Sequence, residues 1–157
     1  EFVSLIPPSE RHDLISAYYR RLTHSDREIQ VAAARAWSVW EGSTLSLLQD
    51  PERVKLFAAD VYAIAFARIE CHYFVLDGFF TSDGQLLQNI RTIRHLPCTI
   101  VHGRYDVVTP VKNAYDLARA WPEADLRIVP EAGHAMTEVG IVSELVAATR
   151  RHAARTT

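Results

Sequence analysis

The chain has 157 residues, 48% of them hydrophobic and 23% charged, with a net charge of −2, which fits a globular protein and argues against a nucleic-acid partner. Two cysteines are too few for a disulfide framework, no apolar stretch approaches the roughly 20 residues of a membrane span, and the first residues lack a signal-peptide pattern. We therefore expect a cytoplasmic protein without a membrane partner.

The first half of the sequence has the periodicity of helices. Ser9 is placed to cap a first helix, and Ser25 with Glu28 forms a capping box for a second helix that runs past Trp40. The apolar residues of the first helix recur every four positions, at Leu14, Tyr18 and Leu22.

A third helical segment begins at Asp50-Pro51, because proline is favoured at the first position of a helix. Almost no helix breaker follows until Asp77-Gly78, which is a long span for one helix. We therefore expect a bend or break near Asp60.

The second half alternates helices and strands. A short amphipathic helix over 84–93 precedes a strand over Cys98–His102, whose residues are typical of buried parallel strands. Pro110 begins another helix, Leu126–Val129 forms a second strand, and a closing helix covers 141–152. This alternation predicts an α/β fold in which crossovers connect parallel strands.

An acid and a histidine follow the two predicted strands. Asp106 comes after Gly103 in TIVHGRYDVVTP, and His134 comes after Gly133 in LRIVPEAGHAMTE. Catalytic groups of parallel sheets collect at the carboxyl ends of the strands. An acid that precedes a histidine also fits the chain order of α/β-hydrolases, in which the acid orients the histidine and the histidine accepts the nucleophile's proton. We predict that Asp106 and His134 are such a pair, although either residue alone is also typical of an ordinary turn or loop.

The nucleophile of such a triad is missing from the sequence. There is no G-x-S-x-G motif and no glycine-rich stretch for an oxyanion hole, and Ser43 lies within or at the end of a helix rather than after a strand. We therefore expect the chain alone to be inactive. No pair of its seven histidines has the spacing of metal ligands, so we expect no metal and no cofactor.

Four segments together resemble one family. WSVWEG, ARIECHYF, IVHGRYDVVTP and AGHAMTE, in this order, are similar to the C-terminal part of the bacterial proline iminopeptidases (prolyl aminopeptidases), which are α/β-hydrolases with a helical cap. The first two segments are the more specific ones, since many α/β-hydrolases share the other two. The resemblance covers essentially the whole chain. It implies a helical cap subdomain over 1–82, followed over 83–157 by the last two strand–helix units of the hydrolase sheet.

The resemblance also implies roles for single residues. Asp106 would be the acid and His134 the base of a serine-hydrolase triad, while Glu41 and Glu70 would bind the imino group of an N-terminal proline. Apolar walls around the prolyl ring would come from Trp37, Trp40, Tyr73 and Phe74. The resemblance leads us to expect Asn after Glu70, where this chain has Cys71.

The implied partners are peptides with N-terminal proline and the missing N-terminal part of the same enzyme, which would carry the serine nucleophile. Two alternatives stay open. One is another capped α/β-hydrolase, such as an esterase or an epoxide hydrolase, which activity on esters without a free imino group would favour. The other is a non-catalytic truncated module that binds prolyl peptides or a partner protein.

Overall fold

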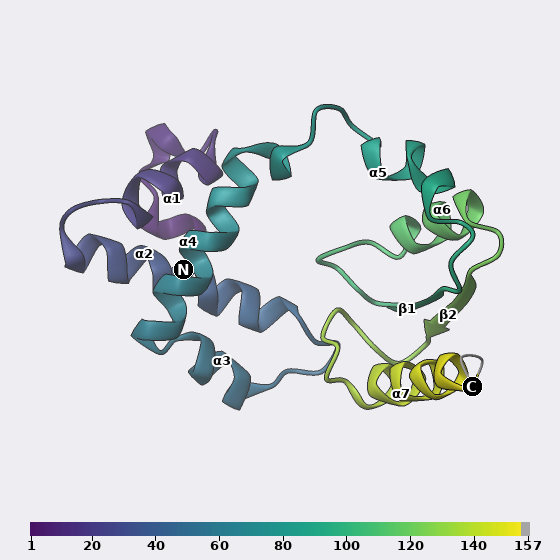
Figure 1. The fold of residues 1–157 in the computed structure, drawn as a ribbon. Coiled ribbons are helices and arrows are strands. Elements are labelled where there is room, and N and C mark those ends of the chain that lie inside the picture. Colours follow the sequence, from purple (N-terminus) through teal and green to yellow (C-terminus); the bar gives the residue numbers. More distant parts are fainter. Residues whose placement is uncertain (155–157) are drawn as a thin grey trace. The chain divides into compact units, whose positions relative to one another are not determined.

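The computed structural model describes residues 1–154, so the last three residues of the predicted second domain lie outside the described part. The chain divides into two compact units. The first unit contains residues 1–43 and 50–81, and the second contains residues 44–49 and the chain from Ser82 onward. Figure 1 shows the order of the elements along the chain.

The first unit is helical throughout. Its helices are α1 (Leu14–Leu22), α2 (Arg27–Thr44), α3 (Pro51–Phe57) and α4 (Asp60–Val75), with short 3₁₀ turns at Val3–Leu5, Pro8–Glu10 and Asp77–Phe79.

The start of α3 and the break before α4 confirm two predictions from the sequence. Pro51 is the first residue of α3, and the carboxylate of Asp50 accepts the N–H of Arg53 in the first turn. The helix ends at Phe57, and α4 begins at Asp60. The long apolar run is thus two helices rather than one.

The predicted caps of the first two helices are wrong by a few residues. Asp13 caps α1 by accepting a backbone N–H of its first turn, and Ser9 lies in the preceding 3₁₀ turn. At α2 the carboxylate of Asp26 accepts the N–H of Glu28, so Asp26 takes the capping role expected of Ser25. Both caps are carboxylates, whose negative charge is favourable at the positive end of the helix dipole.

Aromatic rings and small side chains fill the core of the first unit. The ring centroids of Tyr18 and Trp37 are 5.2 Å apart in an edge-to-face arrangement, and Phe2 stacks on Tyr18 at 4.5 Å. Alanines on α2 and α4 allow close packing around these rings. The buried residues of this core cluster are Ile6, Ala17, Tyr18, Leu22, Ala33, Ala34, Trp37, Ala63, Ile64, Ala67 and Cys71.

The second unit contains both strands. Its elements are α5 (Gln85–Gln88), a 3₁₀ turn at Ile90–Thr92, β1 (Thr99–Gly103), α6 (Lys112–Ala120), β2 (Asp125–Val129) and α7 (Val139–Ala153). The predicted helix over 84–93 is interrupted at Asn89, where the side-chain amide donates to the carbonyl of Gln85 beside the backbone N–H of the same residue. Such side-chain bonds compete with helix continuation.

The two strands pair in parallel, as predicted, and Gly103 is opposite Val129 at their carboxyl ends. Val129 and Ala132 pack with Ile141 of α7 in a second buried cluster. Helices joined to a parallel sheet confirm the α/β class.

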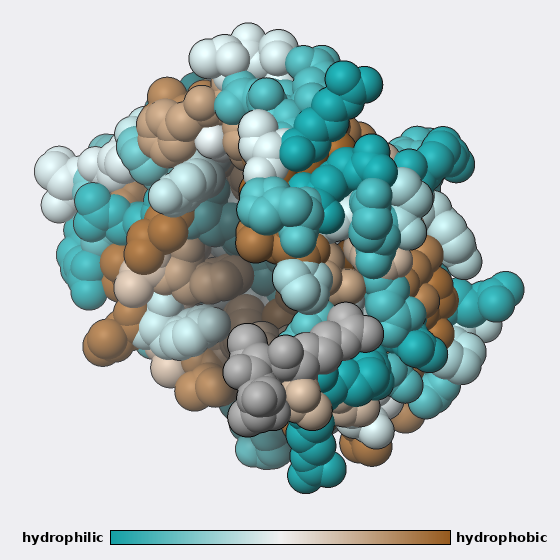
Figure 2. All heavy atoms as spheres, turned by 45° about the vertical axis from the view of Figure 1, so that its right-hand side comes forward, coloured by the Kyte–Doolittle hydropathy of each residue, from teal (hydrophilic) through white to brown (hydrophobic). Residues whose placement is uncertain are grey.

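Large apolar side chains remain exposed in both units. Val61 is 85% exposed, Leu48 79% and Val139 87%. On the face shown in Figure 2, hydrophobic side chains form brown patches between hydrophilic ones. None of the described helices combines the length and the apolar character needed to cross a membrane.

We expect Gly103→Ala to destabilise the fold. A Cβ atom at this position would lie 1.9 Å from the carbonyl oxygen of Gly133 and 2.6 Å from that of Ala132, both of which belong to the backbone. Forced overlap of this kind costs about 3 kcal/mol. The free energy of unfolding in urea measures the loss.

Gly84→Ala is the control for this substitution. A Cβ atom added at Gly84 would lie 3.6 Å from its nearest neighbour, the side-chain nitrogen of Gln88, so there is room for it. The φ of 74° at this position is nevertheless unfavourable for alanine. The expected loss is about 1 kcal/mol, from backbone strain alone. Equal losses in the two variants would contradict the close approach at Gly103.

Candidate active site

The parallel register places the loops after β1 and β2 side by side. The N–H of Arg104 donates to the carbonyl of Val129 at 2.9 Å, and the N–H of Tyr105 donates to that of Ala132 at 3.0 Å. These bonds join the two loops just before Asp106 and His134. As a result, His134 Nδ1 and Asp106 Oδ2 are 2.9 Å apart.

The two oxygens of Asp106 have different partners. Oδ1 accepts the backbone N–H groups of Val108 and Thr109, at 2.9 and 2.8 Å. Oδ2 accepts the Thr109 hydroxyl at 2.8 Å and contacts His134. The carboxylate, whose side chain is only 3% exposed, is therefore both a turn residue and the partner of a histidine.

The proton of His134 can be assigned from these contacts. An ionised carboxylate only accepts hydrogen bonds, so Nδ1 carries the proton and donates it to Asp106. In the neutral ring, this tautomer leaves the lone pair on Nε2, which is the form of histidine that can accept a proton from a nucleophile. The His134 side chain is 34% exposed, so the ring is accessible.

The hydrogen bonds of Asp106 lower its pKa. Burial disfavours the charged carboxylate, but the bonds from the Thr109 backbone, from His134 and from the Thr109 hydroxyl outweigh this effect, so the pKa lies below its ordinary value. Because the pKa of Asp106 is lower in the folded chain, the ionised carboxylate stabilises the fold at pH values above the pKa of the unfolded chain, which is about 4. This stabilisation is lost as the pH falls through the lower pKa of the folded chain.

The difference in unfolding free energy between the wild type and Asp106→Asn should therefore depend on pH. We expect it to be largest above about pH 5 and to shrink as the pH falls below about 4. Urea unfolding at a series of pH values from about 3 to about 6 measures it. Asp83→Asn, at an exposed position of the second unit, is the control. Parallel curves for wild type and Asp106→Asn would contradict the lowered pKa.

Two side chains near this pair were not predicted as site residues. Thr109 donates to Asp106 Oδ2, and its hydroxyl oxygen is also 3.2 Å from His134 Nδ1. His102 is the second of these side chains. Its Nε2 contacts the carbonyl of Thr109 at 2.9 Å and lies 3.4 Å from Asp106 Oδ2. Only the D-x-x-T spacing of Asp106 and Thr109 signals such a contact in the sequence.

Ser43 has a structural role, as its position in the sequence indicates. It lies in α2, and its hydroxyl donates to the carbonyl of Val39 at 2.6 Å. Within residues 1–154, the polar contacts of His134 are to Asp106, Thr109 and Leu45, and none is to a serine or cysteine side chain.

In the first unit, the structure joins two of the residues that the sequence analysis singled out. The indole N–H of Trp37 on α2 donates to Glu70 Oε2 on α4 at 2.6 Å. Trp37 is 2% exposed, while Glu70 is half-buried. The indole thus fixes the direction of the Glu70 carboxylate from the core side.

The other predicted binding residues lie around this contact or apart from it. Glu41 follows Trp37 by one helical turn on α2 and is half-buried. Phe74 packs on Trp37, with ring centroids 6.0 Å apart. Tyr73 contacts Phe79 instead, edge-to-face at 5.4 Å, and is half exposed.

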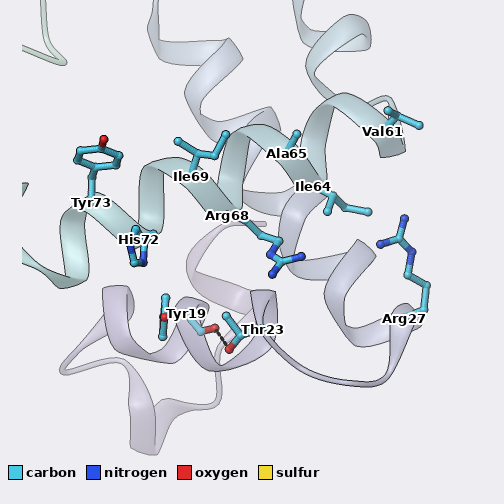
Figure 3. Close-up of a pocket in the computed structure, with 10 residues that line it drawn as sticks. All are labelled: Tyr19, Thr23, Arg27, Val61, Ile64, Ala65, Arg68, Ile69, His72 and Tyr73. Carbon is cyan, nitrogen blue, oxygen red and sulfur yellow. Dashed lines mark hydrogen bonds between the residues drawn. The ribbon is translucent and has the colours of Figure 1, made fainter.

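Figure 3 shows a pocket of about 620 Å³ between α4, α1 and the start of α2. Tyr73 is the one predicted site residue among its lining, which consists of Tyr19, Thr23, Arg27, Val61, Ile64, Ala65, Arg68, Ile69, His72 and Tyr73. Arg27 and Arg68 make this pocket electropositive, and neither Glu41 nor Glu70 lines it. It is therefore unsuited to a cationic imino group.

Cys71 faces the core rather than the Trp37–Glu70 contact. Its thiol donates weakly to the carbonyl of Ile15, with Sγ and oxygen 3.5 Å apart. Burial, together with the nearby negative charge of Glu70, raises the pKa of the thiol to about 11, so it stays protonated at neutral pH. In the described part of the chain, no group of three or more His, Cys, Asp or Glu side chains is arranged to hold a metal ion.

Curated proteins similar to this chain cover nearly all of it. A probable proline iminopeptidase of Leptolyngbya boryana is 56% identical over 156 residues, which are 99% of this chain and 49% of the relative. The proline iminopeptidase of Arabidopsis thaliana is 53% identical over 96% of this chain and 40% of its own length. That of Neisseria gonorrhoeae is 43% identical over 94% of this chain and 46% of its own length.

The chain spans about half the length of the curated relatives it matches. No profile of a known protein family matches it. The identities nevertheless extend over the helical segments and the strand loops alike, so they confirm the resemblance that the four sequence segments indicate. The chain is a homologue of the proline iminopeptidases.

Proposed function

We propose that the chain is the C-terminal part of a serine aminopeptidase that releases N-terminal proline from peptides. The observation that carries the proposal is the hydrogen bond between His134 Nδ1 and Asp106 Oδ2 at the carboxyl ends of two parallel strands. It is supported by relatives named proline iminopeptidases that are similar to nearly the whole chain.

His134 and Asp106 would transfer the protons of this reaction. Nε2 of His134 takes the proton of a serine hydroxyl as the serine oxygen attacks the carbonyl carbon of the proline. Asp106 stabilises the imidazolium that forms, and Nε2 then gives the proton to the leaving amine. Water repeats the sequence to release proline and restore the serine.

The serine and the oxyanion hole would come from the part of the enzyme that precedes this chain. Residues 1–154 supply the acid and the base but no G-x-S-x-G turn. Without a nucleophile the chain alone has no route to an acyl-enzyme, so we expect it to be inactive on its own.

Residues 1–82 would form the cap that recognises the substrate. Glu70 would bind the charged imino nitrogen through its carboxylate. The indole N–H of Trp37 orients this carboxylate by a hydrogen bond of 2.6 Å to Oε2. Glu41 would supply the second carboxylate, since it lies one turn beyond Trp37 on α2. Tyr73 and Phe74, which are each about half exposed, would supply the apolar surface next to the prolyl ring, and Trp37, which is 2% exposed, would act through Glu70.

The test is an assay of the complete enzyme. We expect it to release proline from a Pro-Ala peptide and to lose this activity when a fluorophosphonate labels its serine. The same peptide with an acetylated N-terminus is the control, because it lacks the charged imino group.

Three outcomes would contradict the proposal. Hydrolysis of simple esters without proline release would favour an esterase, and an aspartate in place of the serine, with no labelling by the fluorophosphonate, would favour an epoxide hydrolase. Binding of prolyl peptides without any turnover would favour a non-catalytic module.

A further inference from the structure

Glu138 stands at the start of α7, but its side chain does not cap this helix. The carboxylate turns back towards the loop of His134 instead. Oε1 accepts the N–H of Gly133 at 2.8 Å, and Oε2 accepts the N–H of Leu47 at 3.2 Å. One carboxylate thus connects the residue directly before His134 with a segment 91 positions away from Glu138.

Backbone bonds complete this contact from the other side. The carbonyl of Leu45 accepts the N–H groups of both His134 and Ala135, each at 2.8 Å. Gly133 fits closely against the same segment, because a Cβ atom there would lie 2.9 Å from the nitrogen of Leu47. Residues 45–47 therefore pack closely against residues 133–135. The Glu138 carboxylate bridges the two segments through the amides of Leu47 and Gly133.

We propose that Glu138 is a positioning residue for the peptidase reaction, which holds the backbone before His134 against residues 45–47. The inference rests on the proposed function. Asp106 fixes the imidazole ring at Nδ1, but the ring also moves with the backbone that carries it. Glu138 fixes this backbone and so determines where Nε2 meets the serine oxygen. A displacement of about 1 Å in a catalytic group lowers the rate about 100-fold.

Substitutions at Glu138 in the complete enzyme test this role. Glu138→Ala should lower kcat for a Pro-Ala peptide about 100-fold and leave KM nearly unchanged, because the imino group is bound elsewhere. Glu138→Gln retains one carbonyl oxygen and can accept only one of the two amides. We expect it to restore part of the activity, with kcat about 10-fold below the wild type.

Glu131→Gln is the matched control. It removes the same charge from the same loop, at an exposed position. Its kcat should equal that of the wild type. A loss as large as that of Glu138→Gln would mean that charge, and not the contact to the two amides, matters at this loop, and it would overturn the proposal.

Amide hydrogen exchange gives a second readout that does not depend on peptidase activity. In Glu138→Ala, the amides of Gly133 and Leu47 should exchange about 10- to 100-fold faster. Unchanged exchange at both amides, or a raised KM with an intact kcat, would overturn the proposal. If the wild type releases no proline, the proposed function fails, while exchange still tests the contact. If Glu138→Ala does not fold, Glu138→Gln carries both measurements.

Discussion

Replacing Asp106 with Asn in the complete enzyme should lower kcat for proline release about 10⁴-fold. The carboxylate Oδ2 accepts the Nδ1 proton of His134 at 2.9 Å, which leaves Nε2 free to act as the base. An amide in this place presents either an N–H or a less basic oxygen. When its N–H faces Nδ1, the imidazole proton moves to Nε2, and the ring no longer accepts the proton of the serine.

KM should change little in Asp106→Asn, because no part of the proposed imino-binding site is altered. Thr109→Val is the matched control. It removes one hydrogen bond to Oδ2 but leaves the Nδ1 contact, so kcat should fall by only about 10-fold. Steady-state kinetics on a Pro-Ala peptide separate the two constants. An Asp106→Asn enzyme within about 10-fold of the wild type would exclude Asp106 as the triad acid.

The predictions that the structure confirms come from local sequence signals. A proline after an aspartate marks the start of α3, because both residues act within the first turn. The apolar runs before Gly103 and Gly133 indicate the two strands, and parallel pairing then brings Asp106 and His134 together. Each step depends on near neighbours in the chain or on a general rule of sheet topology.

The features that could not be predicted depend on distant contacts. Residues 44–49 look like a connection between two helices, yet they belong to the second unit and bind the loop of His134. The bond between Trp37 and Glu70 joins positions 33 apart, and only the packing of α2 and α4 creates it. The predicted cap positions were wrong for another reason. Aspartate caps a helix about as well as serine and adds a favourable negative charge at the helix N-terminus, and the spacing alone does not decide between Asp13 or Asp26 and the nearby serines.

The Trp37–Glu70 contact leads to the second large effect. Glu70→Gln should raise KM for prolyl substrates at least about 30-fold, because truncating a desolvated charged partner costs about 2 kcal/mol or more. The neutral amide keeps the shape of the side chain, so the stability of the helical unit should change little. kcat should remain close to the wild type, since Asp106 and His134 belong to the other unit.

Trp37→Phe tests the orientation of the Glu70 carboxylate independently of its charge. Phenylalanine retains an aromatic ring in the core but has no N–H to donate to Glu70 Oε2. We expect KM to rise about 5- to 10-fold, the effect of one lost hydrogen bond. Glu52→Gln, on the exposed face of α3, is the charge control and should leave KM unchanged. If Glu70→Gln also left KM unchanged, Glu70 would be only a partner of the buried indole, and the imino group would have to bind elsewhere.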